Sequence, residues 1–594
     1  MAAGQPAARA WLPYSLAVVA GLAVIAGAYV IVRPATGPGT DRSSCVALEV
    51  NSSTEKDHLL GQLAERYNAA DRRFGGHCAQ VSVHGLNSGK AMEALAAGNW
   101  AGRQPTFPTP QVWLPTSSLW TSRLRMLEQQ EPGRPAQIAE RTYPSIATSP
   151  LVIAMPQEKG ELVRQRGPLG WADLLGLSGD AGWAAFGRPE WGRFTFGKDN
   201  PSLSTSGLAA TIATYYAAVG RSSDLTKADL GRPAVTQFVR RIEANVSHYS
   251  DDSVDLLRDL AEADLGAIGD ARARDMSAVV VQEELVYQYN EGQLSPTPGD
   301  KPRVPLVAVH PKEGTFNLDH PYVVLASTDE AQRAAAQDFL AFLQAAPQQR
   351  SFAELGFRDH EGRPSDALLA AVGGGPGAEL VTFDPPEPEV VDAILRGWGT
   401  LRKKANILLA VDTSGSMTAP VGGSTRFKVA TAAAYKGVDL LNSADRVALW
   451  SFSSETPQRP GKPYGEEVPL GPFNRAVFKR GLAELRPEGN TALYATVRAA
   501  HRHLRDNYDP DRINAVVVLT DGKNEYPKDN DLARLLKDIA LDPQRPVKVF
   551  CVAFDQQSDL PALEQIATAS AGKAFNAKDP TTIDEAFVKL VSSF

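Results

Sequence analysis

The sequence predicts an α/β protein with several domains, and three observations support this prediction. The chain has 594 residues, which is more than one hydrophobic core usually supports, so roughly three or four domains are expected. Strand patterns alternate with helix patterns along most of its length, as is typical of α/β folds. Several strand patterns are unbroken apolar runs, which indicates strands of a parallel sheet covered by helices on both faces.

The charge of the chain argues against one class of partner. The net charge is −7, and residues of both signs are interspersed without long basic runs. Nucleic-acid-binding proteins usually carry a basic patch or stripe. We therefore expect no nucleic-acid partner.

The first elements lie near the N-terminus. Residues 14–32, YSLAVVAGLAVIAGAYVIV, carry no charge, and a helix of this length spans the hydrocarbon core of a bilayer. We therefore predict a cytoplasmic N-terminus at residues 1–13, a transmembrane anchor at 14–33, and a single-pass cell-membrane protein. The resemblance of the adjoining sequence to exported proteins implies that the C-terminal bulk is outside the cytoplasm. Arg9 and Arg33 flank the segment and determine its orientation only weakly. A cleaved signal peptide is the alternative.

Two of the three cysteines precede strand patterns. Cys45 and Cys78 begin alternating apolar stretches, and a helix pattern separates them. In a βαβ unit the two strand starts can be neighbours, so a disulfide between these cysteines is predicted for an exported domain. Two buried free thiols are the alternative. Cys551 lies inside an apolar strand pattern and is expected in the core.

Residues 44–365 contain one further feature of interest. NPSLSTSG, at residues 200–207, places a Ser/Thr-rich turn before a strongly apolar helix, and such a helix start can present backbone amides to an anion. Together with the strand and helix order, this region resembles a type 2 periplasmic solute-binding protein. The resemblance implies two lobes, with residues 44–147 and 305–365 in the first and 148–304 in the second.

The same resemblance implies a ligand cleft between the lobes. In that family, hydroxyls and amides at helix starts hold the ligand, here a small anion or another polar solute. The matching positions are Ser52, Ser53, Ser117, Ser118, Ser204, Thr205 and Ser206. Each group can equally be an ordinary helix cap or turn.

Residues 366–400 read as a linker followed by a helix. Gly and Pro dominate its first part, which is typical of a linker. Apolar residues then recur at helical spacing. They are Val390, Val391, Ile394, Leu395, Trp398 and Leu401. We expect a short amphipathic helix that packs at the base of the last domain.

The last region, residues 401–594, has the most specific motif in the chain. Asp412, Ser414 and Ser416 follow the apolar run of ILLAVDTSGSM, Asp521 ends INAVVVLTD, and Thr491 precedes an apolar helix pattern. All five fall on loops at strand or helix ends, where ligands bind in an open α/β sheet. Two carboxylates and three hydroxyls are hard oxygen donors, which Mg²⁺ prefers and Mn²⁺ accepts. A capped turn is the alternative.

These motifs resemble a von Willebrand factor type A domain with a metal-ion-dependent adhesion site. DTSGS matches the D-x-S-x-S motif of that family, Thr491 its lone threonine, and Asp521 its TDG aspartate. The resemblance implies a doubly wound, Rossmann-like sheet. It also implies that Mg²⁺ (or Mn²⁺) is bound and that a partner protein's Asp or Glu completes the metal shell.

The function expected from these features is binding. The metal cluster offers ligands but no poised base or nucleophile, so we expect no enzyme activity, and metal-dependent hydrolysis is the weaker reading. We predict a membrane-anchored, extracytoplasmic protein for metal-dependent adhesion or protein interaction. The alternative is the solute-binding component of an ABC-type transporter.

Overall fold

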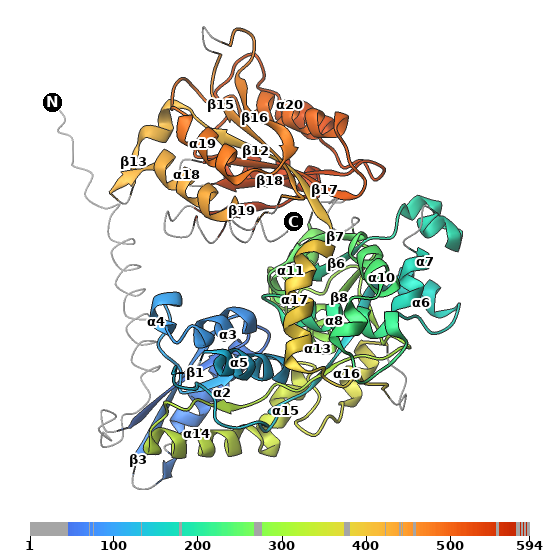
Figure 1. The fold of residues 1–594 in the computed structure, drawn as a ribbon, viewed down its shortest axis with the longest axis vertical. Coiled ribbons are helices and arrows are strands. Elements are labelled where there is room, and N and C mark those ends of the chain that lie inside the picture. The colour runs from blue at the N-terminus through green and yellow to red at the C-terminus, as the bar shows by residue number, and fades with distance from the viewer. Residues whose placement is uncertain are drawn as a thin grey trace, which may run out of the picture.

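The fold is described from a computed structural model of the chain. It describes residues 45–577 except 71, 75–76, 132, 178–180, 267–275, 374–379, 422, 439–440, 442, 456–458 and 554–557, and further on residues 583, 586 and 590. Two bodies are visible in Figure 1: a C-terminal α/β domain and a larger, two-lobed body. The α/β fold class is confirmed in both.

The first lobe is built on a five-stranded sheet with the order β11-β4-β1-β3-β2. β1 pairs in parallel with both β3 and β4, so their carboxyl ends share one edge. The strands are β1 (Val46–Ser52), β2 (Arg73–Phe74), β3 (His77–Gly85), β4 (Val112–Leu114) and β11 (Val323–Val324). The helices are α2 (Asp57–Ala69), α3 (Ser88–Ala96), α4 (Trp100–Arg103), α5 (Ser118–Gln130), α14 (Glu330–Leu343) and α15 (Ala346–Glu354).

The second lobe has a six-stranded sheet with the order β10-β5-β8-β6-β7, and β9 also pairs with β5. The strands are β5 (Ser149–Pro156), β6 (Phe196–Asp199), β7 (Val246–Ser250), β8 (Ala278–Gln282), β9 (Leu306–Val309) and β10 (Asn317–Leu318). The helices are α6 (Gln157–Arg164), α7 (Trp171–Leu177), α8 (Thr205–Val219), α9 (Lys227–Leu230), α10 (Pro233–Glu243), α11 (Ser253–Leu265), α13 (Glu283–Asn290) and α16 (Asp366–Ala371). Because β9 and β10 belong to this sheet, the chain rejoins the first sheet only at β11, later than the expected boundary at residue 305.

The C-terminal domain is a six-stranded sheet with the order β16-β15-β12-β17-β18-β19. Its strands are β12 (Lys404–Asp412), β15 (Arg446–Phe452), β16 (Tyr464–Pro472), β17 (Arg512–Thr520), β18 (Val547–Ala553) and β19 (Ala574–Asn576). Its helices are α18 (Arg426–Gly437), α19 (Arg475–Glu484), α20 (Leu493–Asp506), α21 (Leu532–Asp538) and α22 (Leu560–Ala569). The strands are parallel except for the edge strand β16, which follows β15 too closely for a parallel crossover.

The predicted linker helix is present as α17 (Pro388–Leu401), but its packing partner differs from the expectation. It contacts α5 of the first lobe and α8, α9 and α10 of the second, and it meets the last domain only at its C-terminal end (Figure 1). Its apolar stripe is buried, as the spacing predicts, with the exception of the partly buried Leu395. An amphipathic pattern reveals that one face is buried and not what covers it.

The prediction of a single-pass membrane protein is contradicted. Among the residues that the structure describes, no helix is long and apolar enough to cross a bilayer. α8, for example, has 15 residues, which gives a length of about 22 Å, against about 30 Å for a hydrocarbon core. The predicted N-terminal segment and anchor, residues 1–33, lie outside the described residues.

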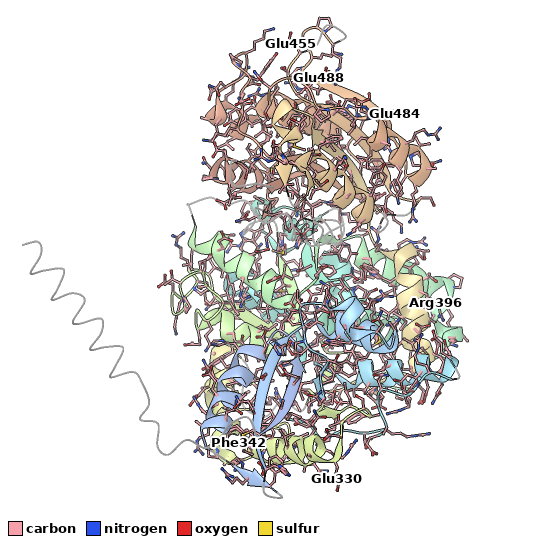
Figure 2. The ribbon with its side chains drawn as sticks, turned by 90° about the vertical axis from the view of Figure 1, so that its left-hand side faces the viewer. Glu330, Phe342, Arg396, Glu455, Glu484 and Glu488 are labelled. Carbon is pink, nitrogen blue, oxygen red and sulfur yellow. A yellow bond between two sulfur atoms is a disulfide. The ribbon has the colours of Figure 1, made fainter. Side chains whose placement is uncertain are left out.

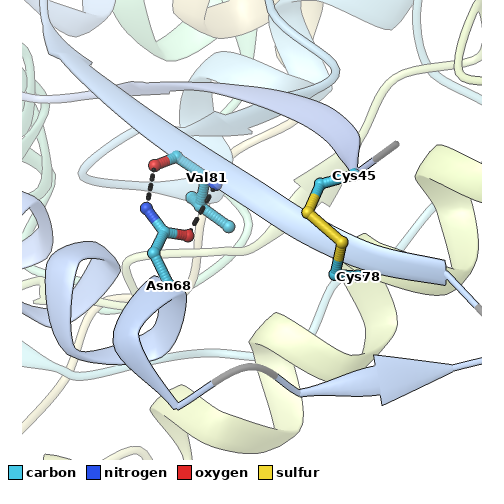
Figure 3. The surroundings of a disulfide bond; sticks show 4 residues. All are labelled: Cys45, Asn68, Cys78 and Val81. Atoms are coloured by element: carbon cyan, nitrogen blue, oxygen red, sulfur yellow. Dashed lines mark hydrogen bonds between the residues drawn. A yellow bond between two sulfur atoms is a disulfide. The ribbon is translucent and has the colours of Figure 1, made fainter. Parts of the chain in front are cut away.

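Cys45 and Cys78 form a disulfide with a Cα–Cα distance of 4.5 Å (Figure 3). The bridge joins the starts of β1 and β3, where Val46 lies opposite Ala79 in the parallel register. Nearby, the side-chain amide of Asn68 bonds both backbone groups of Val81, at 2.8 and 2.9 Å, and so holds the end of α2 against β3. Cys551 is buried and unpaired.

Replacing both Cys45 and Cys78 by serine should destabilise the first lobe. The bridge closes a loop with a sequence separation of 33 residues, and removing such a loop constraint costs about 3.5 kcal/mol in the chain-entropy model. Urea unfolding of the wild-type and double-variant proteins measures the difference. Glu65→Ala, at an exposed position on α2 of the same lobe, is the control, and equal midpoints for wild-type and double-variant proteins would contradict the prediction.

Candidate metal site and solute cleft

Two buried carboxylates lie side by side at the carboxyl edge of the C-terminal sheet. β12 and β17 run in parallel with Val411 opposite Leu519, so Asp412 and Asp521 follow at nearly the same level. Both aspartates are fully buried. The pairing of the two strands therefore brings together two residues that are 109 positions apart in the printed sequence.

The hydroxyls predicted as metal ligands join the two carboxylates into one network. Asp412 Oδ1 accepts from the backbone amide of Ser414 at 2.8 Å, and the two hydroxyl oxygens of Ser414 and Ser416 are 2.9 Å apart. Ser416 Oγ donates to Asp521 Oδ1 at 2.9 Å. The structure thus brings the D-x-S-x-S turn and the TDG aspartate together.

Two members of the network were missed by sequence reasoning. Thr520 Oγ1 donates to Asp412 Oδ2 at 2.6 Å, and Arg426 Nη1 lies 2.9 Å from Asp521 Oδ2. Arg426 begins α18 after a short hairpin, and no motif in its sequence marks it as part of this site. Its guanidinium supplies one positive charge to two buried carboxylates.

The electrostatics of Asp412 reflect its burial. Loss of solvation raises the pKa of this carboxyl to about 7, although hydrogen bonds from Thr520 and Ser414 oppose the shift, and the neighbouring charge of Asp521 adds to it. A buried carboxylate that water does not stabilise gains most from a nearby cation.

Thr491 completes the set from a third loop. Its side chain is buried, and a Cβ placed on Gly522 would lie 3.0 Å from its hydroxyl oxygen, so glycine allows the two loops to approach. Ser416, Thr491 and Asp521 line one cavity of about 500 Å³, together with Lys523 and Asp559. Hydroxyl and carboxylate oxygens around one cavity fit a hard divalent cation. Within the described residues there is no group of three or more His, Cys, Asp and Glu that could hold a metal, so such a site would depend on its hydroxyls.

The predicted cleft residues divide into two groups. Ser53, Ser204, Thr205 and Ser206 line a small cavity of about 20 Å³ between the lobes, close to the space needed for a single water. Ser52, Ser117 and Ser118 do not line it. Ser52 Oγ donates to a neighbouring carbonyl, Ser117 caps α5, and the amide of Ser118 donates to Asp319 Oδ1 at 2.8 Å.

The charged residues near the cavity were not found from the sequence. Glu55 and Asp252 line it, with Lys56 and His320 buried beside Glu55. Burial alone would raise the pKa of Glu55, but Lys56 and His320 lower it to about 2. Glu55 is therefore ionised and paired with Lys56, whereas burial raises the pKa of Asp252 to about 6.

Comparison with known proteins identifies both parts of the chain. Residues 48–358, just over half of the chain, match the family model described as bacterial extracellular solute-binding protein. The chain belongs to the bacterial extracellular solute-binding protein family. Residues 406–589 match the von Willebrand factor type A domain. Both expected resemblances, and the fold class that follows from them, are therefore confirmed, and no curated protein matches the chain.

Solved structures resemble one part of the chain at a time. A von Willebrand factor type A protein from Catenulispora acidiphila is 24% identical with a TM-score of 0.27, over 32% of this chain and 42% of that one. The sulfate-binding protein SubI from Mycobacterium tuberculosis is 16% identical with a TM-score of 0.36, over 60% of this chain and 98% of that one. A periplasmic thiamin binding protein is 12% identical with a TM-score of 0.39, over 61% of this chain and 98% of that one.

The free energy of unfolding of the second lobe of the solute-binding domain should depend on pH. Asp199 is fully buried, accepts from Ser204 Oγ at 2.6 Å, and burial raises its pKa to about 8. The folded state therefore keeps a proton on Asp199 that the unfolded chain releases near pH 4. The free energy of unfolding consequently decreases as the pH rises from about 4 to 8.

Urea unfolding at pH 5 and pH 8.5 tests this dependence. The wild-type protein should lose more stability over this interval than Asp199→Asn, whose amide does not ionise. Asp506→Asn, an exposed carboxylate on α20, is the control. The same loss in wild type and Asp199→Asn would contradict the assignment.

Proposed function

We propose that this protein is a metal-dependent protein-interaction factor, in which the von Willebrand factor type A domain binds Mg²⁺ (or Mn²⁺) and a partner's Asp or Glu completes the metal shell. The network that joins Asp412, Ser414, Ser416 and Asp521 at one edge of the sheet is the observation that supports this most directly. The solute-binding domain would act as the second binding module of the same chain.

The charge of the site supports a divalent cation. Asp412 and Asp521 are fully buried, and Arg426 provides one positive charge for the two carboxylates. Asp412, Ser414, Ser416, Thr491 and Asp521 would hold the metal, which when bound would supply an exchangeable position for an oxygen ligand. These five side chains are short and supply few oxygen ligands, so a carboxylate from a partner protein can also reach the metal position.

The surroundings support recognition of an acidic group rather than catalysis. Lys523 is exposed at the cavity that Ser416, Thr491 and Asp521 line, but Glu525 and Asp559 line it too, so attraction of a partner's carboxylate depends on the bound dication. At the end of the C-terminal domain that faces away from the two-lobed body (Figure 2), Glu455 accepts from Lys528 Nζ at 2.7 Å and from the amide of Gly461 at 3.0 Å, which connects two loops. We propose that the chain is not an enzyme, since the side chains at the edge of the C-terminal sheet are suited to hold a metal and bind a partner.

A second candidate function is the delivery of a solute to an ABC-type transporter. The family match over residues 48–358 and the two lobes favour it. The two functions differ in their dependence on metal, because solute capture in the cleft does not involve the edge of the C-terminal sheet.

Asp412→Asn should abolish metal binding while the protein stays folded. The amide keeps the shape of the side chain and an acceptor for the Ser414 amide, but it removes the charge that a dication needs. Isothermal titration with MgCl₂ and MnCl₂ should show an affinity at least ~100-fold lower, which corresponds to about 2.7 kcal/mol. Asp506→Asn should bind as wild type does, and unchanged affinity in Asp412→Asn would refute the site.

Partner capture should require the metal. Immobilised protein is incubated with a bacterial cell extract in Mg²⁺, in EDTA, and in EDTA followed by excess Mg²⁺. Bound proteins should disappear with EDTA, return with Mg²⁺, and decrease for Thr491→Ala. Lys523→Ala should weaken capture without lowering the metal affinity, because the lysine is exposed beside the site and is not a metal ligand. Capture that persists undiminished in EDTA would leave the solute-binding domain as the interaction surface.

A further inference from the structure

α17 spans the two lobes of the solute-binding domain. It packs on α5 of the first lobe and on α8, α9 and α10 of the second. Val391 and Ile394 on its buried face belong to one apolar cluster with Met92 and Trp120 of the first lobe and Leu208 of the second. One helix from outside both lobes therefore shares a core with each of them.

Polar contacts fix α17 to each lobe separately. Asp392 is buried and its Oδ1 lies 3.3 Å from Arg123 Nη2 on α5. Near the other end, the Trp398 ring packs edge to face on Tyr249 of β7, with 5.4 Å between centroids. The Tyr249 hydroxyl in turn donates to Glu243 of α10 at 2.5 Å. Asp392 thus contacts the first lobe and Trp398 the second.

The end of α17 is also fixed to the C-terminal domain. Arg402, directly after α17, lies with its Nη2 2.8 Å from Asp445 Oδ2, and this pair is almost completely buried. Asp445 Oδ1 accepts the amide of Ala405 at 2.9 Å. β12 follows within three residues and ends at Asp412. α17 and β12 are therefore connected through buried contacts rather than through a free linker.

The lobes themselves are closed. The amide of Gly89 in α3 donates to the carbonyl of Leu203 across the cleft at 2.9 Å, and Trp120 Nε1 donates to Thr205 Oγ1 at 2.7 Å. A Cβ on Gly89 would lie 2.4 Å from the carbonyl oxygen of Ser202, so the close approach depends on glycine. A solute larger than a water can enter this cleft only if the lobes separate.

We infer that α17 is a latch that holds the two lobes closed, and that opening of the solute cleft is coupled to release of the C-terminal domain. Separation of the lobes moves α5 away from α8 and α10, so α17 must lose its contacts with one of the two lobes. Because α17 continues into β12, its release changes the position of the C-terminal domain relative to that lobe. The coupling is reciprocal, so displacing that domain would favour the open cleft. This inference does not depend on the proposed metal function.

Paired spin labels on the full-length protein test the latch. Glu65→Cys and Lys227→Cys place labels on exposed positions of α2 and α9, one in each lobe, while the native cysteines are paired or buried. Ile394→Ala should shift the distance distribution towards longer values. Glu389→Ala, on the exposed face of α17, should leave it unchanged. If Ile394→Ala fails to fold, Arg123→Gln replaces it, since it removes the contact of the first lobe with Asp392.

A second variant tests the coupling from the other side. Gly89→Ala forces the lobes apart without touching α17, so the amides of residues 390–401 should exchange with deuterium at least ~10-fold faster than in the wild type. Gly61→Ala, at a helical glycine of α2 with open space around it, is the matched control. Wild-type distances in a folded Ile394→Ala protein, or lobes opened by Gly89→Ala with unchanged exchange in α17, would overturn the inference.

Discussion

The parallel pairing of β12 with β17 is the constraint on which the C-terminal site depends. It places Asp412 and Asp521 at one edge of the sheet, where neither reaches water. Burying two like charges is unfavourable unless positive charge and hydrogen bonds compensate. Arg426 and the hydroxyls of Ser416 and Thr520 provide part of that compensation. Most of the unusual features of this edge follow from the need to stabilise those two carboxylates.

The two-lobed domain meets the same physical problem with a different solution. Glu55 is compensated by Lys56, which is buried with it, and Asp319 occupies the start of α5, which an anion would otherwise use. Carboxylates of the protein itself thus pair with a lysine of the cleft and accept from a backbone amide there. The closed cleft is therefore satisfied by its own side chains, whereas the edge of the C-terminal sheet keeps its hydroxyls facing a cavity.

The sequence predicted what is local and missed what depends on distant contacts. Asp412, Ser414, Ser416 and Asp521 were singled out because they follow apolar runs, where a parallel strand must end in a loop, and Thr491 because it precedes an apolar helix pattern. Arg426 and Thr520 were missed because nothing in their immediate sequence indicates which carboxylate they contact. The stripe of α17 correctly predicted a buried face, but its partner is determined by three-dimensional packing. Likewise, hydroxyls at helix starts indicated a cleft and gave no sign of Glu55 and Asp252, whose burial arises only when the lobes meet.

The position of α17 connects these two halves of the molecule physically. Its apolar face extends one hydrophobic cluster from both lobes towards one face of the C-terminal sheet, where Leu401, Ala405 and Ile407 continue it. A flexible linker would let each domain bind independently, since Gly-rich chains transmit little force or orientation. Here the glycine-rich stretch precedes Val381, whereas the segment from Val381 onward is tied down, with Thr315 bonding both Val381 and Phe383 through the backbone. The glycine-rich sequence thus precedes the contacts that orient the C-terminal domain, and the carboxyl edge of that domain's sheet is held in a defined relation to the cleft between the lobes.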